Sequence, residues 1–489
     1  MYKVKTNRVD LFLFLLLVLL IFWMPIPLGS IHPLELGFFQ ITSFLLVLFW
    51  LLSQISILKP LPAIIKQHQN LLVLFTLCVA YQLIYLIPLS PGLLEILSPK
   101  TLETYELTSV TEIRNLTLSY DIGLSLNELL KSAAYLSVFI LIVLLVSNRT
   151  RLVLISISVC CVGLLNSAIG FIKSIPLDLF FSDPLSAFEN ANRVYGTYGN
   201  PSHFAGLLEV SIPITLGLII ATSQQSSLGD FQQKISDSFH KFIHKTLWLY
   251  LALVIMILAM LFSGSRGGNF SLILALLTSG ILLIFIRGFK PRENIILLMV
   301  ILAMMTIFAV IGTTKLSTIY LRDGTSENLT LRGEYIKASI KIFREYPVLG
   351  VGSGNWQYAF PMYVNVNSRA SQINRNVAHA HNDYLELLNE QGIIGFALNA
   401  VAVSWIIFLG IQGIRQKHDP LIRGVLYGAL TAIFSLLIHA LIDFNFHIPA
   451  NMSYFFIMMA LVIVASSLPD KKTQERSSTY QSIASAKPS

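Results

Sequence analysis

The residues best suited to chemistry lie at 378–395, AHAHNDYLELLNEQGIIG, where a long polar segment gives way to an apolar one. His379 and His381 are two positions apart and cannot share a helix face, so the pair is not expected to bind a metal ion. A histidine such as His381, at the mouth of a membrane cavity, can move protons near neutral pH, or it can be a hydrogen-bonded structural residue. Glu386 and Glu390 lie one helical turn apart, which favours a solvated or salt-bridged face over an acid/base couple.

Two arginines stand in glycine-rich turns that lead toward predicted helices. Arg193 begins the segment RVYGTYGNPSHFA, and a guanidinium beside the free N–H groups of a helix N-terminus suits an anion. Arg266 lies in SGSRGG at membrane depth, where an arginine costs ~2.5–3.5 kcal/mol unless it faces a cavity or a partner. The glycines beside it allow a close backbone approach to an anion. The alternatives are an Arg193 that faces lipid headgroups and an Arg266 that reaches the interface from a glycine hinge.

Three further features have weaker chemical signals. Residues 331–346 predict a helix whose apolar face is expected to rest on the membrane, with Ile336, Ile340 and Phe343 at helical spacing. The following LGVGSG lacks a nucleotide-binding context, so a flexible turn is expected there.

His439 and Asp443 are one helical turn apart near membrane depth. An inward hydrogen bond between them is expected, either to position a helix or to orient a substrate.

These residues are expected to be held by membrane helices. Of the 489 residues, 54% are hydrophobic and 12% are charged, about half the charged fraction of an ordinary soluble protein. Apolar runs long enough to cross a bilayer recur along the chain. We expect an all-α polytopic membrane protein with about twelve spans, at 10–28, 36–57, 70–89, 128–147, 152–172, 203–222, 247–263, 269–286, 294–312, 392–411, 424–442 and 450–467.

The distribution of Lys and Arg predicts the orientation. Outside the long loop, most of them fall in alternate connecting segments, which places both termini in the cytoplasm and the loop at about 313–391 outside. We expect one membrane domain, residues 1–467, and a disordered cytoplasmic tail, residues 468–489. The net charge of +8 follows from this bias and does not indicate nucleic-acid binding.

Five segments together resemble the O-antigen ligase and O-antigen polymerase superfamily of bacterial envelope glycosyltransferases. They occur in that family's order and cover roughly residues 190–451. The matching pieces are RVYGTYGNPSHFAG (193–206), SGSRGG (263–268), LRGEYIKASIKIFREYPVLGVGSG (331–354), HNDYLELLNEQGIIG (381–395) and HALIDFNFHIPAN (439–451).

The resemblance implies a GT-C-like fold in the bacterial inner membrane with a periplasmic active site. The implied donor is an undecaprenyl-diphosphate-linked glycan, transferred to an acceptor hydroxyl without a metal ion or other cofactor. It implies that Arg193 and Arg266 clamp the diphosphate and that His381 positions or activates the acceptor. Further partners would be membrane lipids and other envelope polysaccharide assembly proteins. Six more residues in the matching pieces are expected to contact substrate: Arg332, Asn200, His203, Asn382, Asp383 and Tyr384.

The sequence leaves open the identity of the acceptor and two alternative functions. The acceptor is either the lipid A-core oligosaccharide, for a ligase, or another repeat unit, for a polymerase. A transporter of lipid-linked sugars or small anions would need charged or broken helices near the bilayer midplane. A structural scaffold would tolerate alanine at Arg193, Arg266 and His381.

Overall fold

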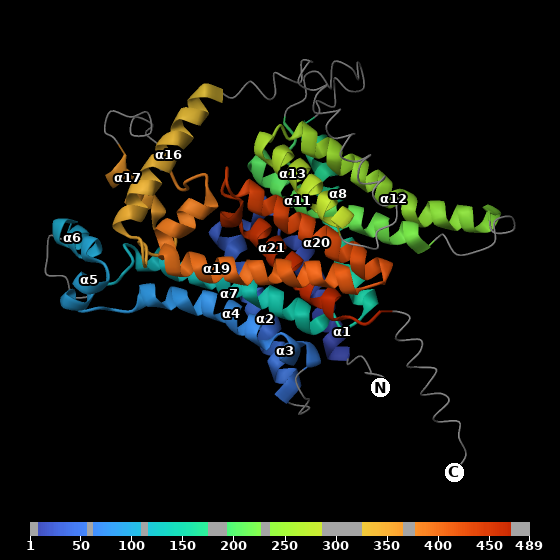
Figure 1. The fold of residues 1–489 in the computed structure, drawn as a ribbon, viewed down its shortest axis with the longest axis horizontal. Helices are drawn as coiled ribbons and strands as arrows, with labels where there is room; N and C mark the ends of the chain where they lie inside the picture. Colours follow the sequence, from blue (N-terminus) through green and yellow to red (C-terminus); the bar gives the residue numbers. More distant parts are fainter. Residues whose placement is uncertain are drawn as a thin grey trace, which may run out of the picture.

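The computed structural model describes residues 8–55, 62–108, 116–174, 193–225, 235–285, 325–364 and 377–470. Helices make up the fold (Figure 1). Their bounds are α1 Arg8–Trp23, α2 Pro33–Ile55, α3 Ala63–Gln67, α4 Gln69–Tyr81, α5 Pro91–Leu97, α6 Pro99–Thr108, α7 Ile122–Leu145, α8 Arg149–Ser174, α11 Pro201–Gln225, α12 Ile235–Phe262, α13 Arg266–Phe285, α16 Thr325–Glu345, α17 Trp356–Tyr363, α19 Asp383–Gln416, α20 Pro420–His439 and α21 Pro449–Ser467, with 3-10 turns η1 Leu28–Ser30, η2 Gln82–Leu86 and η3 Asn445–His447.

The chain is a polytopic helical membrane protein. Eight helices of the described residues are long and apolar enough to span a bilayer, and two shorter apolar stretches lie at Leu247–Phe262 and Arg266–Leu282. Every predicted span overlaps a helix except 294–312, which lies outside the described residues. The count of twelve spans therefore stays a prediction.

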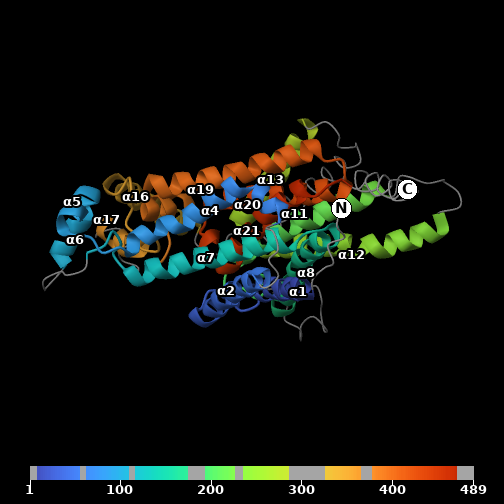
Figure 2. The same ribbon diagram turned by 90° about the horizontal axis from the view of Figure 1, so that it is seen from below.

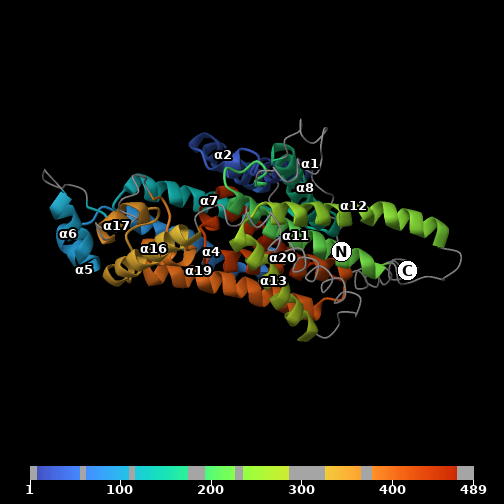
Figure 3. The ribbon, with the colours of Figure 1, turned by 90° about the horizontal axis from the view of Figure 1, so that it is seen from above.

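Helix α11 is the centre of the bundle. Its potential membrane-spanning stretch is entirely buried, whereas only 22–28% of the corresponding stretches of α2, α4 and α19 is buried. It packs closely on α20, because a Cβ atom at Gly217 would lie 2.2 Å from the carbonyl oxygen of Gly424. Small residues allow such close contacts between membrane helices. Figures 2 and 3 show α19 on one face of this core and α1 and α2 on the other.

Several connections predicted to be cytoplasmic meet at one end of the bundle. Arg149 at the start of α8 forms an ion pair with Asp419 and donates a hydrogen bond to the Pro469 carbonyl at 2.9 Å. Lys417 after α19 donates to the Leu468 carbonyl at 2.7 Å. These contacts place the start of α20 and the end of α21 on the same side.

The opposite end carries α5, α6, α16 and α17 (Figure 1). Helix α16 packs on α17 through Tyr335, Ile342 and Trp356, which belong to a small separate core. The apolar stripe with Ile336 and Ile340, which are 38% and 40% exposed, does not pack on α17, and its predicted contact with the membrane stays a prediction. The buried stripe is the adjacent one, because it is the stripe that meets α17.

Helix α19 is broken at Gly392, where φ is 62° and ψ is −171°. A Cβ atom there would lie 2.1 Å from the Val348 carbonyl oxygen, so only glycine fits. The expectation of a flexible turn at LGVGSG is wrong, because backbone hydrogen bonds to α19 hold this turn. The Val351 and Gly352 amides donate to the Asn389 and Glu390 carbonyls at 2.9 Å each, so this turn caps the segment before the break.

Candidate active site

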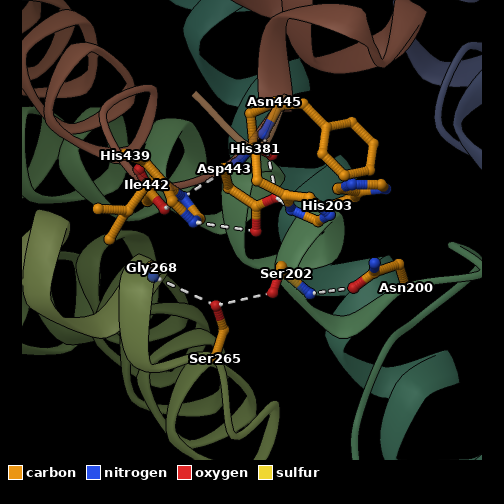
Figure 4. A network of polar contacts seen from close by, with 12 residues as sticks. Asn200, Ser202, His203, Ser265, Gly268, His381, His439, Ile442, Asp443 and Asn445 are labelled. Carbon is orange, nitrogen blue, oxygen red and sulfur yellow. Dashed lines mark hydrogen bonds and ion pairs between the residues drawn. The ribbon is translucent and has the colours of Figure 1, made fainter. Parts of the chain in front are cut away.

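Five helix ends meet at the α16 end of the bundle and enclose a group of polar side chains (Figure 4). α11, α13 and α21 begin there, α20 ends there, and the loop 377–382 leads there into α19. The Asp383 amide donates to the Ala440 carbonyl at 2.9 Å, which joins that loop to the end of α20. The chain reverses direction at each connection, so segments far apart in sequence converge.

The structure brings both predicted arginines to this group. The Arg193 Nε donates to the Ser263 carbonyl at 2.8 Å, and the Val194 amide donates to the Phe262 carbonyl at 3.0 Å. Arg193 thus lies against the turn that carries Arg266, whose side chain is exposed. Arg332 on α16 reaches the same region and donates from Nη1 to the Ile442 carbonyl at 2.9 Å.

Two helix N-termini face each other beside the arginines. The Ser265 Oγ accepts the Gly268 amide at 3.2 Å and caps α13, and it lies 3.3 Å from the Ser202 Oγ at the start of α11. The Asn200 side-chain oxygen accepts the Ser202 amide at 2.8 Å. N-termini present unpaired amide donors and positive dipole ends, so this pair of helices favours an anion.

His381 is oriented by Asp443. Its Nδ1 lies 3.2 Å from the Asp443 Oδ1, and its ring stacks on Tyr335 with ring centroids 6.0 Å apart. The His381 backbone has φ 51°, a left-handed conformation that is uncommon for residues other than glycine and is found at functional sites. Burial raises the pKa of Asp443, but the His381 hydrogen bond and the charge of His439 outweigh it and hold that pKa below its ordinary value.

The expected hydrogen bond between His439 and Asp443 is not formed. The two side chains are 3.9 Å apart at their nearest charged atoms, whereas the His439 Nδ1 lies 2.6 Å from the Glu209 Oε1. Ser435 donates to the other Glu209 oxygen at 2.9 Å. Glu209 is fully buried on α11. Sequence reasoning missed it, although a lone carboxylate in the apolar run LLEVSIPIT was a usable signal.

A second cluster lies behind His381 and was also missed. Glu386 accepts from the Ala380 amide at 2.8 Å and lies 2.8 Å from the His379 Nδ1 and 3.2 Å from the His447 Nε2. The His447 Nδ1 lies 2.9 Å from the Asp383 Oδ1. Burial lowers the pKa of His447, but the charge of Glu386 and the Asp383 hydrogen bond outweigh it and raise that pKa to about 10.

His379, Glu386 and His447 have the residue types of a metal site, and their ligand atoms lie within 4.8 Å of one another. The sequence argument tested only the pair His379 and His381, so it did not consider this set. Each ring nitrogen of His447 faces a carboxylate, which favours an imidazolium whose Nε2 proton points to Glu386 and whose single charge offsets one of the two carboxylates. A metal ion would have to displace that proton.

The other predicted substrate contacts have protein partners in the structure. Asn382 caps α19 by accepting the Leu385 amide at 2.9 Å, Asp383 holds His447, and Tyr384 donates to the Leu437 carbonyl at 2.7 Å. The buried His203 ring packs on Phe444, with ring centroids 4.7 Å apart. Contact of these four residues with substrate stays a prediction.

One comparison with known protein families finds a match to part of the chain. Residues 251–400 match the family model Wzy_C, described as O-antigen ligase. The matched segment contains Arg266, Arg332 and His381 and ends within α19. No curated protein matches the sequence. This match over part of the chain supports the O-antigen ligase and polymerase superfamily and a membrane enzyme of the ligase/polymerase type.

Proposed function

We propose that the protein is a glycosyltransferase of the inner membrane that acts at the periplasmic face. Its donor is an undecaprenyl-diphosphate-linked glycan, and its acceptor is a hydroxyl of the lipid A-core oligosaccharide. The observation that carries this proposal is the convergence of Arg193, Arg266 and two helix N-termini beside the His381–Asp443 pair. One side suits a diphosphate, and the other suits a hydroxyl that must lose a proton.

The proposed reaction is a direct displacement at the anomeric carbon. The acceptor oxygen forms a bond to that carbon as the bond to the diphosphate oxygen breaks, and the diphosphate leaves with the electron pair. Arg193 and Arg266 stabilise the charge that develops on the leaving group, as does the pair of helix N-termini. The His381 Nε2 accepts the acceptor proton, while Asp443 holds Nδ1 and stabilises the imidazolium.

The arrangement also bears on the rival functions. A transporter requires polar groups that line a path across the membrane, whereas the polar cluster described here gathers where helices begin and end. The described parts of α2, α4 and α21 have apolar surfaces along most of their length. Catalysis at one membrane face explains this distribution better than transport does.

Purified protein in lipid nanodiscs, supplied with lipid-linked glycan and lipid A-core acceptor, tests the activity. We expect glycan to appear on the acceptor, and Arg266→Ala to abolish transfer without loss of folded protein. A deletion strain separates ligase from polymerase. A ligase defect leaves lipid-linked polymer and lipid A without long chains, and a polymerase defect leaves single lipid-linked repeats. Normal polysaccharide in the deletion strain contradicts both activities.

A further inference from the structure

Three potential metal ligands from separate segments meet behind His381. His379 lies in the loop before α19, Glu386 lies in the first turn of α19, and His447 lies in η3 before α21. The Glu386 Oε1 is 2.8 Å from the His379 Nδ1 and 3.2 Å from the His447 Nε2, and the two nitrogens lie within 4.8 Å of each other. Two imidazole nitrogens and one carboxylate oxygen are a common set of zinc ligands.

The spacing of these three atoms is close to the spacing around a zinc ion. A tetrahedral Zn²⁺ with ligands at ~2.0–2.2 Å holds the ligand atoms roughly 3.3–3.6 Å apart. Small shifts bring both distances from the Glu386 oxygen into this range. The two nitrogens approach each other when the imidazole rings rotate about χ2, a torsion with broad energy minima. The cluster can therefore close around an ion without a change in the backbone.

Hydrogen bonds already orient two of the three ligands. The Asp383 Oδ1 accepts from the His447 Nδ1 at 2.9 Å, which leaves Nε2 facing Glu386. The Ala380 amide donates to the Glu386 Oε2 at 2.8 Å, and the other oxygen, Oε1, faces both histidines. Metal-binding histidines usually donate their second ring N–H to a carboxylate, and metal-binding carboxylates are hydrogen-bonded in turn. The cluster thus has the outer contacts of a metal site as well as its ligand types.

The charge of the cluster also suits a divalent cation. Among the described residues, the ion-pair partners of Asp383 and Glu386 are histidines. A His447 imidazolium offsets one of these two carboxylates. Zn²⁺ bound to a neutral His447 would offset both, and the Nε2 proton would pass to solvent.

An ion and a further ligand can reach the cluster. The His379 and His447 side chains are 28% and 17% exposed, although Glu386 is buried. His447 also lines a cavity of about 350 Å³. A water molecule occupies ~30 Å³, so this cavity can hold a water molecule as the fourth ligand.

We propose that His379, Glu386 and His447 bind one divalent transition-metal ion, with Zn²⁺ as the expected one. The ion joins the loop before α19 to the first turn of α19 and to the turn before α21, so it stabilises this end of the bundle. The Phe444 ring centroid is 4.5 Å from that of His379 and 4.8 Å from that of His381. The ion thus supports the loop that carries His381, and the transfer reaction itself does not use it.

Direct binding tests the site without requiring transfer. Protein purified without a polyhistidine tag is treated with EDTA, placed in phosphatidylcholine nanodiscs and titrated with Zn²⁺ against a fluorescent chelator. We expect one Zn²⁺ per chain with a Kd of about 1 µM or tighter, and a melting temperature that rises with Zn²⁺. X-ray absorption should show nitrogen and oxygen neighbours at ~2.0–2.2 Å from the zinc. Excess Mg²⁺ should not displace the ion, because Mg²⁺ prefers oxygen ligands.

Variants locate the bound ion. His379→Ala and His447→Gln should each weaken Zn²⁺ binding at least tenfold, and Asp383→Asn should weaken it ~10–100-fold because it no longer orients His447. The melting temperature of His379→Ala should no longer rise with Zn²⁺. His418→Ala is the matched control, because His418 is exposed and pairs with Asp470, 3.6 Å away, at the other end of the bundle.

Zn²⁺ binding that neither His379→Ala nor His447→Gln weakens places the ion elsewhere and overturns the proposal. Displacement by Mg²⁺ at a similar concentration, or no binding up to about 100 µM Zn²⁺, also overturns it, and the cluster is then an internal ion-pair network. His381→Gln should bind Zn²⁺ as the unaltered protein does. Normal Zn²⁺ binding by a protein that shows no transfer supports the metal site and counts against the proposed function alone.

Discussion

Asp443→Asn is the substitution that best tests the catalytic pair. The change keeps the size of the side chain and removes the charge that faces His381 at 3.2 Å. At an effective dielectric constant of about 20, a unit charge pair at 3.2 Å interacts by roughly 5 kcal/mol before solvent screening. Screening is appreciable, because the His381 side chain is 29% exposed. A hydrogen bond to a charged group contributes about 1.5–3 kcal/mol in practice, which corresponds to a decrease in kcat of roughly 10–150-fold.

The pH profile provides a second readout. A general base works in its neutral form, so the rate should rise with pH as that form becomes populated. Asp443 stabilises the imidazolium, and its loss should move that rise to lower pH while the plateau falls. A residue that only positions helices would lower stability and leave the midpoint of the rise unchanged.

The assay is transfer from lipid-linked glycan by purified protein, measured between pH 5 and 9 alongside His381→Gln. We expect His381→Gln to lose the ~10²–10⁴-fold that general-base catalysis typically contributes. Asp470→Asn is the matched control, since Asp470 pairs with the exposed His418, 3.6 Å away, at the other end of the bundle. Near-normal turnover of His381→Gln, or an Asp443→Asn profile with an unshifted midpoint, refutes the general-base role.

Four further outcomes follow from the same structure. Arg266→Lys keeps the charge but loses the guanidinium fork, so transfer should fall at least tenfold with normal expression, and equal activity of the two proteins would rule out a bidentate diphosphate contact. Transfer should survive EDTA, because arginines and helix N-termini hold the diphosphate, and activity that returns only with added divalent ions would contradict this. Gly392→Ala should lower the melting temperature by forcing a positive φ and a clash, with an added cost of roughly 1–3 kcal/mol, whereas Gly37→Ala should not, since a Cβ atom at Gly37 meets no atom within 4 Å. Reporters fused at 360 and 418 should read external and cytoplasmic, respectively, and the reverse would place the site in the cytoplasm.

The sequence by itself determined the class of the protein and indicated candidate chemical groups, whose roles stay predictions. Long apolar runs specify membrane helices, because an apolar segment of about 20 residues is stable across a bilayer whatever its neighbours are. Arg193 and His381 were selected as candidates for their residue types beside such runs, and Arg266 because an arginine at membrane depth is costly unless it faces a cavity or a partner. These are local properties, which can be read from a short stretch of chain.

The partners of those residues depended on tertiary structure. The spacing of His439 and Asp443 suggested a bond along one helix, but α20 ends at His439, and Asp443 turns toward His381 instead. His379 and His447 meet at Glu386 only because the loop before α19 lies against the turn before α21. The contacts of His381 with Asp443 and of Asp383 with His447 join positions 62 and 64 residues apart, so no local pattern encodes them.

Packing also decided which surfaces are buried. The periodicity of α16 marked the stripe with Ile336, whereas contact with α17 buries the neighbouring stripe with Tyr335 and Ile342. Gly392 and the LGVGSG turn were ambiguous for the same reason, since glycine permits both a flexible turn and a close contact. Only the tertiary structure, in which the backbone at Val348–Gly352 approaches the backbone at Asn389–Gly392, distinguishes a flexible turn from a close contact. The sequence thus determined the helices and the candidate groups, and the arrangement of helix ends determined which of those groups face one another.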